Sequence, residues 1–225
     1  SSCSVHLQGL AMRSAPEQAP SWKQRQRAER EALILQHAQE LLVEKGYHRT
    51  SLDEIAARVG VSKGTIYLHF TSKDALVEAL LAQQINLFLV AVQQIADEPV
   101  SVRARLERIL VWTYRQLQEK RGQFLLEIAS RFGLTHQILE QRADLRLRAE
   151  QALNRLAALL DEGKRDGEIA NDVPTTILVA TLQSLLAPER YLQLLAAGQV
   201  TPEALAAYVV RLLVGKGSAS AATDG

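Results

Sequence analysis

Apolar residues recur along most of this chain with the spacing of an α-helix. Between Lys23 and Gly46 they lie mostly one, three or four positions apart, at Ala28, Leu33, Ile34, Ala38, Leu41 and Leu42. That spacing lines one face of a helix, and Gly46 predicts its end because glycine readily adopts a left-handed backbone. No segment alternates between apolar and polar residues as a strand does, and no repeat of fixed period is evident. The pattern therefore predicts an all-α fold.

Hydroxyl side chains predict where the next helices begin. Thr50 and Ser51 are each followed three positions later by an acidic residue, so either could form a capping box. The short helix after them is predicted to end at Gly60, and a third helix runs from Ser62 to about Phe70. Further helices are predicted at 73–96, 101–120, 124–132, 135–163 (a single long helix), 174–197 and 202–214, with an interruption at Gly122 and a kink or split at Pro188.

Composition places the chain among soluble globular proteins. Of its 225 residues, 47% are hydrophobic and 23% are charged, which suits a packed core rather than a disordered chain. Cys3 is the only cysteine, so we expect no intrachain disulfide, no metal site and a reducing, cytoplasmic compartment. No uninterrupted apolar run reaches the roughly 18 residues that cross a bilayer, so no membrane partner is expected.

Charge alone does not identify a partner. The formal net charge is +1, and residues 22–74 carry nine Lys and Arg against seven Asp and Glu. This slight basic excess fits an N-terminal unit that binds DNA, but an excess of two arises easily by chance.

The segment from Thr50 to Lys73 carries the most informative pattern. It reads TSLDEIAARVGVSKGTIYLHFTSK, which is two short helices joined by a tight turn, the arrangement of a helix-turn-helix. Gly64 permits close approach of another molecule to the second helix. The outward positions of that helix carry Ser62, Lys63, Thr65, Tyr67 and His69. Such groups donate to phosphates, contact a thymine methyl group or bond to base edges in a major groove.

Phosphate contacts are also predicted beside this second helix. Thr50 and Ser51 lie at a helix N-terminus, where free N–H groups attract an anion, and Lys73 opens the following helix. A purely structural explanation competes, because short capped helices with polar outer faces are common, and Tyr67 or His69 alone is more often structural. The combination of residues favours DNA binding.

This run resembles the DNA-binding unit of the TetR family of transcriptional regulators. The resemblance lies in GVSKGTIYLHFTSKDAL after LDEIAARV and extends over about residues 25–81. It implies a homodimer whose two recognition helices enter successive major grooves of a near-palindromic operator. It also implies base contacts around Lys63, Gly64, Thr65 and Tyr67, and phosphate contacts from Thr50, Ser51, Tyr67, His69 and Lys73. The expected organisation is a flexible arm (1–21), a DNA-binding domain (22–73), a helical regulatory and dimerisation domain (74–215) and a loose tail (216–225).

The two C-terminal helices carry more apolar residues than one buried face requires. These are Ile177, Leu178, Leu182, Leu185, Leu186, Leu205, Tyr208, Val209, Leu212 and Leu213. Surplus apolar surface suggests a partner helix, and the family resemblance points to a four-helix dimer interface. The alternative is that both helices lie in the core of the monomer.

An effector cavity is expected between the middle helices. Residues that could line it are Phe88, Trp112, Tyr114, Phe124, Phe132, Arg131, His136 and Gln183. Since no charge cluster dictates a ligand chemistry, an apolar or amphipathic effector is favoured. The helix at 73–96 joins the two domains, so we expect it to transmit ligand binding to the DNA-binding unit.

Enzyme function has no support in the sequence. There is no HExxH motif, no Gly-rich phosphate loop and no recognisable Ser, His and acid arrangement, and no cofactor is expected. The sequence predicts a repressor released from a palindromic operator by a small ligand. The alternatives are a chromosome-organising DNA-binding protein of the same family and a ligand-dependent activator.

Overall fold

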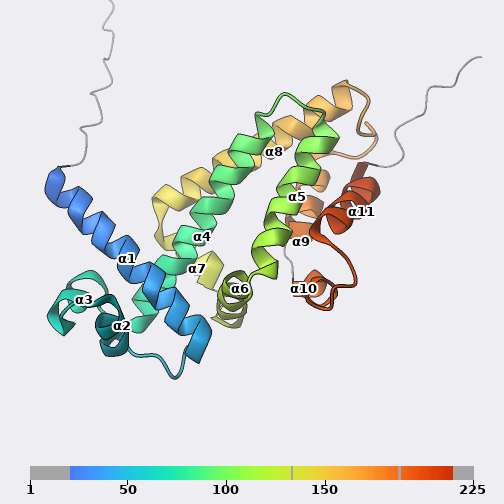
Figure 1. The fold of residues 1–225 in the computed structure, drawn as a ribbon. Coiled ribbons are helices and arrows are strands. Elements are labelled where there is room, and N and C mark those ends of the chain that lie inside the picture. Colours follow the sequence, from blue (N-terminus) through green and yellow to red (C-terminus); the bar gives the residue numbers. More distant parts are fainter. Residues whose placement is uncertain (1–20, 133, 187–188, 215–225) are drawn as a thin grey trace, which may run out of the picture.

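The protein has a small head at one end, built around residues 22–73, and a helical body at the other (Figure 1). The computed structural model describes residues 21–132, 134–186 and 189–214, and within these every regular element is an α-helix. The predicted arm and tail fall outside the described residues, apart from Ser21. The helices are α1 (Trp22–Lys45), α2 (Leu52–Val59), α3 (Lys63–His69), α4 (Lys73–Ala96), α5 (Val102–Gln118), α6 (Lys120–Phe132), α7 (Leu134–Gln141), α8 (Ala143–Arg165), α9 (Thr175–Leu186), α10 (Glu189–Ala196) and α11 (Pro202–Val214).

Serine side chains cap most of the helices that the sequence predicted to begin with a hydroxyl. Ser51, rather than Thr50, accepts the capping hydrogen bond of α2, from the backbone N–H of Glu54. Equivalent caps start α3, α4 and α5, at Ser62, Ser72 and Ser101. Each satisfies one of the backbone N–H groups left free in the first turn of a helix. The helix starts predicted at these positions are confirmed.

Helix α4 belongs to two hydrophobic cores. Its N-terminal half contributes Leu76 and Leu80 to a core that contains the buried residues of α1, α2 and α3. Its C-terminal half contributes Leu89 and Val92 to a second core, built with α5, α8, α9 and α11. The first core also includes Ile128 of α6 and further buried residues of α7 and α8. Packing is therefore continuous across the boundary between head and body.

The sequence pattern misplaced the junction between α5 and α6. Gly122 was expected to interrupt a helix, but it lies inside the first turn of α6, which begins at Lys120. The break falls at Glu119, whose backbone is extended (φ −74°, ψ 138°). A methyl group at position 122 would lie 2.0 Å from the carbonyl oxygen of Gln116. Glycine is therefore required because α6 starts in close contact with the end of α5.

The single helix predicted over 135–163 is wrong, because two helices occupy this region. The chain breaks at Arg142, where φ is −107° and ψ is 92°. On the α7 side, Ile138 packs in the core of the head, as does Leu145 at the start of α8. Farther along α8, Ala152 packs in the core of the body. The break allows both cores to be filled, and neither a glycine nor a proline marks it in the sequence. The predicted kink or split at Pro188 lies outside the described residues, between α9 and α10.

One helix in the described part of the chain, α4, is long and apolar enough to cross a membrane by length and composition alone. The same profile is typical of the core helix of a soluble protein. Since buried residues of α4 pack in both cores, we assign its apolar surface to the interior of this protein.

A buried arginine joins the helices of the body. One guanidinium nitrogen of Arg105, on α5, donates to the carbonyl oxygen of Ala96 at 3.1 Å, and the guanidinium also pairs with the carboxylate of Glu162 on α8. The Arg105 partner holds the pKa of Glu162 below its ordinary value. A buried charge is stable only when it is paired in this way, so the contact fixes α8 against α4 and α5.

Candidate nucleic-acid interface

Helices α2 and α3 form the predicted helix-turn-helix. Gly60 ends α2 with a left-handed backbone (φ 79°, ψ 27°), which glycine adopts without the steric cost that other residues incur. The backbone N–H groups of Gly60 and Val61 both donate to the carbonyl oxygen of Ala56, at 3.0 Å. Ala56 and Ile66 are fully buried between the helices. The turn thus holds α3 against α2 through a small set of apolar contacts.

The outer face of α3 is exposed and polar. Ser62, at its N-cap, accepts a hydrogen bond from the N–H of Thr65 and lies 2.8 Å, hydroxyl to hydroxyl, from the same residue. The Lys63 side chain is 72% exposed and the Tyr67 residue 49% exposed. At Gly64, a methyl group would meet nothing closer than the Ser62 hydroxyl, at 3.8 Å. Donors, acceptors and one aromatic ring therefore share a surface that another molecule can approach closely.

Lys63 pairs with an acidic neighbour on α2. Its ammonium donates to the carboxylate of Asp53, and this hydrogen bond raises the pKa of Lys63 above its ordinary value. An ion pair between exposed side chains contributes little free energy. Lys63 therefore remains charged and can exchange this carboxylate for a phosphate.

Two of the predicted phosphate ligands form hydrogen bonds inside the head instead. Thr50 is buried, and its hydroxyl donates to the carbonyl oxygen of Gly46 at 2.9 Å. The Lys73 ammonium donates to the carbonyl oxygens of Tyr47 at 2.7 Å and Thr50 at 3.0 Å. It also lies 4.0 Å from the centre of the Tyr47 ring, a cation–π distance. These contacts tie the loop between α1 and α2 to the start of α4.

His69 also turns inward, toward α1. Its side chain is only 8% exposed, and its Nδ1 lies 3.7 Å from a carboxylate oxygen of Glu31. That distance is within ion-pair range but too long for a hydrogen bond, and no described residue gives this nitrogen a hydrogen-bond partner. Ser51, in contrast, is exposed at the start of α2. Of the predicted contacts, the open surface therefore holds Ser51, Ser62, Lys63, Gly64, Thr65 and Tyr67.

The sequence reasoning missed one exposed residue of α3. Leu68 is 78% exposed, although an apolar residue in a short helix is normally expected to face the core. A helical projection gives the signal that was available, because Leu68 follows the buried Ile66 by two positions and so lies about 200° around the helix. Leu68 adds an apolar group next to Tyr67 on the outer surface.

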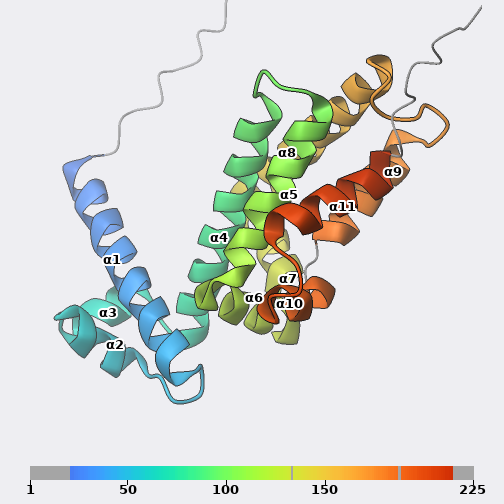
Figure 2. The same ribbon diagram turned by 45° about the vertical axis from the view of Figure 1, so that its right-hand side comes forward.

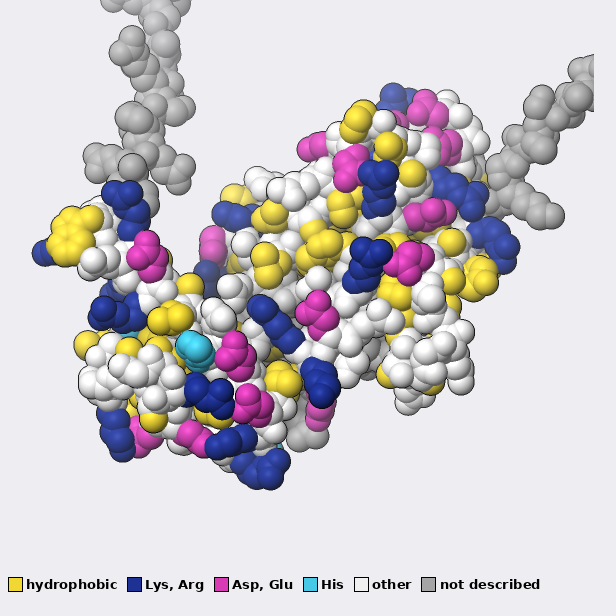
Figure 3. Space-filling view, in the orientation of Figure 1, with side chains coloured by type: hydrophobic (Ala, Val, Ile, Leu, Met, Phe, Trp, Pro, Cys, Tyr) yellow, Lys and Arg dark blue, Asp and Glu magenta, His cyan; other side chains and the backbone are white. Residues whose placement is uncertain are grey.

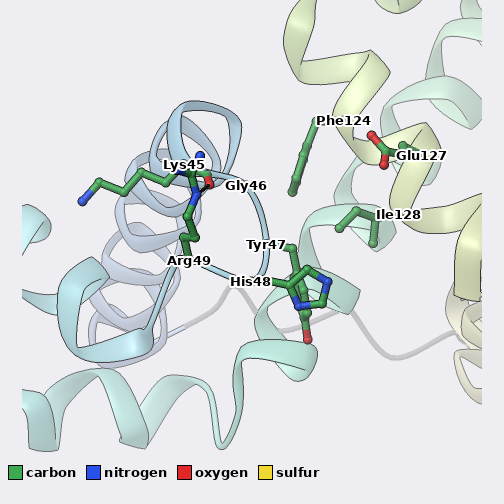
Figure 4. Close-up of a pocket in the computed structure, with 8 residues that line it drawn as sticks. All are labelled: Lys45, Gly46, Tyr47, His48, Arg49, Phe124, Glu127 and Ile128. Atoms are coloured by element: carbon green, nitrogen blue, oxygen red, sulfur yellow. Dashed lines mark hydrogen bonds between the residues drawn. The ribbon is translucent and has the colours of Figure 1, made fainter.

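A pocket lies where the head meets the body. Its volume is about 270 Å³, and it is lined by the loop after α1 and by residues of α6 (Figure 4). Tyr47 and His48 contribute from the loop, while Phe124 and Ile128 face them from α6. The Tyr47 hydroxyl donates to the carboxylate of Asp74 on α4. Burial and this hydrogen bond raise the pKa of Tyr47 to about 12, so the hydroxyl stays protonated at neutral pH.

The residues predicted to bind an effector are dispersed among the described elements. The rings of Phe88 and Trp112 lie 6.2 Å apart in the body, and Tyr114 is completely buried 5.9 Å from Tyr191. Phe124 lines the pocket between head and body instead. His136 and Gln183 are exposed. The side chains of Arg131 and Phe132 lie outside the described residues. Tyr114 is thus a core residue, and His136 and Gln183 are surface residues.

The C-terminal helices α9 and α11 lie side by side on the outside of the body (Figure 2). One face of this pair packs inward, through residues such as Leu178, Leu182 and Val209. Other residues of the pair, Ile177, Tyr208 and Leu212, are exposed, and Leu212 is 83% exposed. Leu185 and Leu186 lie outside the residues whose side chains are described. The two helices therefore supply residues to the core and also carry large apolar residues that this chain does not cover.

Comparison with known proteins identifies the head. The model of the bacterial regulatory proteins of the TetR family matches residues 34–80. The fatty acid metabolism regulator protein of Bacillus subtilis is 29% identical over 136 residues, which are 60% of this chain and 69% of that protein. The family match covers the second half of α1, α2, α3 and the first turns of α4, so it includes the exposed polar face of α3.

Solved structures extend the likeness over most of the chain. A transcriptional regulator of the TetR/AcrR family from Thermobifida fusca is 28% identical and superposes with a TM-score of 0.67, over 84% of this chain and 98% of that one. FadR of Bacillus subtilis, solved in complex with stearoyl-CoA, has the same fold, with 24% identity, a TM-score of 0.57 and coverage of 82% and 97%. The helical body thus matches as well as the head. The chain is a member of the TetR family of bacterial regulatory proteins.

Proposed function

We propose that this protein is a homodimeric transcriptional repressor that binds a palindromic operator and leaves it when a small ligand binds. The observation that carries the proposal is the outer face of α3, where Ser62, Lys63, Thr65 and Tyr67 surround the open position of Gly64. Hydroxyl, ammonium and aromatic groups on a short exposed helix match the chemistry of base edges and phosphates in a major groove.

The roles of the predicted DNA ligands follow from their exposure. Lys63, Thr65 and Tyr67 would contact bases or adjacent phosphates, and Ser51 would contact a phosphate at the N-terminus of α2. Thr50 and Lys73 would act mainly by holding α2 and α4 in register, because their polar groups bond within the head. Leu68 would add an apolar contact, for instance with a thymine methyl group.

Dimerisation would use the exposed apolar residues of α9 and α11. A helix-turn-helix dimer reads two half-sites about one helical turn of DNA apart, so the two heads must be held at a fixed separation. Ile177 of α9 and Tyr208 and Leu212 of α11 are exposed, and the same two helices of a second copy would cover them by two-fold symmetry.

The effector would be apolar or amphipathic, and α4 would transmit its binding. FadR of Bacillus subtilis, which has this fold, was solved with stearoyl-CoA, a ligand with a long apolar chain. Since α4 packs in both cores, a ligand that favours one position of α4 in the body would also favour one position of the head. The ligand shifts the equilibrium only by its difference in affinity for the two arrangements.

Selection of binding sites from random duplexes by the purified protein tests the proposal. We expect a palindromic sequence to emerge, with half-sites about one helical turn apart. Tyr67→Ala should weaken binding to this sequence without changing the dimer or its melting temperature. Leu147 is an exposed residue on α8, and Leu147→Ala should change neither DNA affinity nor melting temperature. Failure to enrich any sequence, or equal affinity of wild type and Tyr67→Ala, would contradict the proposed reading surface.

Two further measurements separate this function from its alternatives. Mapping of bound sites in the producing cell should give a few promoters, while many dispersed sites would indicate a chromosome-organising protein. A reporter gene placed under a mapped promoter should be expressed more strongly when the protein is deleted. Lower expression after deletion would indicate an activator.

A further inference from the structure

We propose that the projecting first turns of α1 form a second DNA contact, in which a stripe of cationic side chains holds the phosphate backbone next to the groove that α3 reads. This inference rests on the proposed DNA-binding function and deepens it. The stripe consists of Lys23, Gln26, Arg27 and Arg30, which we call the α1 basic stripe.

The spacing of the stripe places its members on one side of the helix. Positions 23, 26, 27 and 30 are related by steps of three and four residues, so they form a single face. Arg25 is two residues from Lys23, about 200° around the helix, and therefore points to the opposite side. Three cations share the stripe, and no acidic residue belongs to it.

The first turns of α1 extend beyond the core of the head. Every residue from Ser21 to Arg30 is exposed, and the first buried side chain in α1 is that of Ile34. Twelve residues precede Ile34 in this helix, which corresponds to roughly 18 Å. These turns gain little stability from the helix itself, because most helical stability in proteins comes from packing. A capping box formed by Ser21 and Gln24 begins the helix, and Figure 3 shows Lys and Arg side chains along this projecting end.

The basic stripe faces the recognition helix across a hollow. All four stripe residues line a hollow of about 340 Å³, and its other wall is formed by Leu68 and His69 of α3. None of the described residues that line it carries a carboxylate. The His69 side chain is 8% exposed, and its Nδ1 has no hydrogen-bond partner in the described structure. The stripe and the exposed Leu68 of α3 therefore border one concave, cationic surface.

The dimensions of the stripe suit a nucleic-acid strand. Lys23 and Arg30 are seven residues apart, about 10 Å along the helix. A strand of a duplex presents a continuous row of phosphates, so a stripe of this length can contact more than one of them. Arginine binds phosphate with two parallel hydrogen bonds, and its long side chain can reach across a hollow. We therefore assign the hollow to the sugar–phosphate backbone rather than to an acidic protein.

The test compares Arg27→Gln and Arg30→Gln with Arg25→Gln, which makes the same change of charge on the opposite face of the same exposed helix. Affinity for the selected operator is measured over a range of salt concentrations. In a dimer each stripe variant removes two phosphate contacts, so the slope of log affinity against log salt should fall by about two. The expected loss at 0.15 M salt is about thirtyfold. Arg25→Gln should keep the wild-type slope.

Ethylation of individual phosphates supplies a second measurement. Phosphates whose modification blocks the wild-type protein but no longer affects Arg27→Gln would be those that the stripe holds. If the wild type binds the operator and all three variants share its salt dependence, the inference is wrong while the proposed function stands. If the wild type binds no duplex, the proposed function itself fails. Binding of the stripe to an acidic protein instead would leave DNA affinity unchanged in every variant.

Discussion

Replacing Lys73 with methionine distinguishes a structural lysine from a phosphate ligand. Methionine keeps the length and the apolar stem of the side chain but removes the ammonium, which donates to the carbonyl oxygens of Tyr47 and Thr50 and lies over the Tyr47 ring. Hydrogen bonds to a charged group contribute about 1.5–3 kcal/mol each and an exposed cation–π contact about 0.5–1 kcal/mol. Because Lys73 is only half-buried, water can replace part of these interactions. We therefore expect the free energy of unfolding to fall by about 2–3 kcal/mol.

The free energy of unfolding, measured by urea denaturation at equal protein concentration, is the appropriate assay. The control is Lys63→Met, which removes an equivalent charge from α3. The Lys63 side chain is 72% exposed and pairs with the partly exposed carboxylate of Asp53, so we expect the free energy of unfolding to change much less than in Lys73→Met. In a protein of this size, the loss predicted for Lys73→Met corresponds to a melting temperature roughly 4–12 °C lower.

The two variants should therefore give opposite results in urea denaturation and in a measurement of operator affinity. Lys73→Met should reduce stability, whereas Lys63→Met should reduce operator affinity and leave stability nearly unchanged. If Lys73→Met unfolds like the wild type and only its affinity for DNA falls, the inward contacts of Lys73 contribute no stability. The reasoning from the loop and α4 would then be refuted.

Four substitutions test three other contacts. Gly122→Ala should lower the melting temperature, because the added methyl group would lie 2.0 Å from the Gln116 carbonyl oxygen, while Gly64→Ala should melt at or slightly above the wild-type temperature because its nearest neighbour is 3.8 Å away. Glu162→Gln should destabilise the protein at neutral pH. Because Arg105 lowers the pKa of Glu162, the wild type should be more stable than this variant above pH 4.5, the ordinary pKa of the group. The difference in stability should disappear as the pH falls through the lowered pKa. Tyr47→Phe should cost about 0.5–1.5 kcal/mol, equally from about pH 6 to pH 9, because the pKa of Tyr47 is raised to about 12. Denaturation curves at several pH values check all three, and a Gly64→Ala protein less stable than Gly122→Ala would contradict the first.

Local signals in the sequence predicted the head well. Capping serines, the left-handed glycine at position 60 and the apolar spacing of α1 act over a few residues, so they can be recognised without knowledge of the whole fold. The outward positions of α3 followed from the same short-range geometry. Ser62, Lys63 and Tyr67 are on the surface because Ile66 must face the core.

Contacts between distant segments could not be predicted in this way. The break at Arg142 depends on which core Ile138 enters, and the inward turn of Lys73 depends on carbonyl groups more than twenty residues earlier in the chain. His69 faces α1 rather than solvent for the same reason. The candidate effector residues show the limit most clearly, since aromatic side chains such as Phe88 and Tyr114 suit a cavity and a packed core equally well.

The shared core of α4 limits how the DNA-binding unit can be moved between proteins. A fragment ending at Lys73 would lose Leu76 and Leu80, together with the part of α6 that contains Ile128, and would leave the inner faces of α1 and α2 open to water. Hybrid regulators made by exchanging only the first 73 residues should therefore be unstable or poorly soluble. Exchanges that keep each head with its own α4 and α6 would preserve the hydrophobic surfaces that these helices cover.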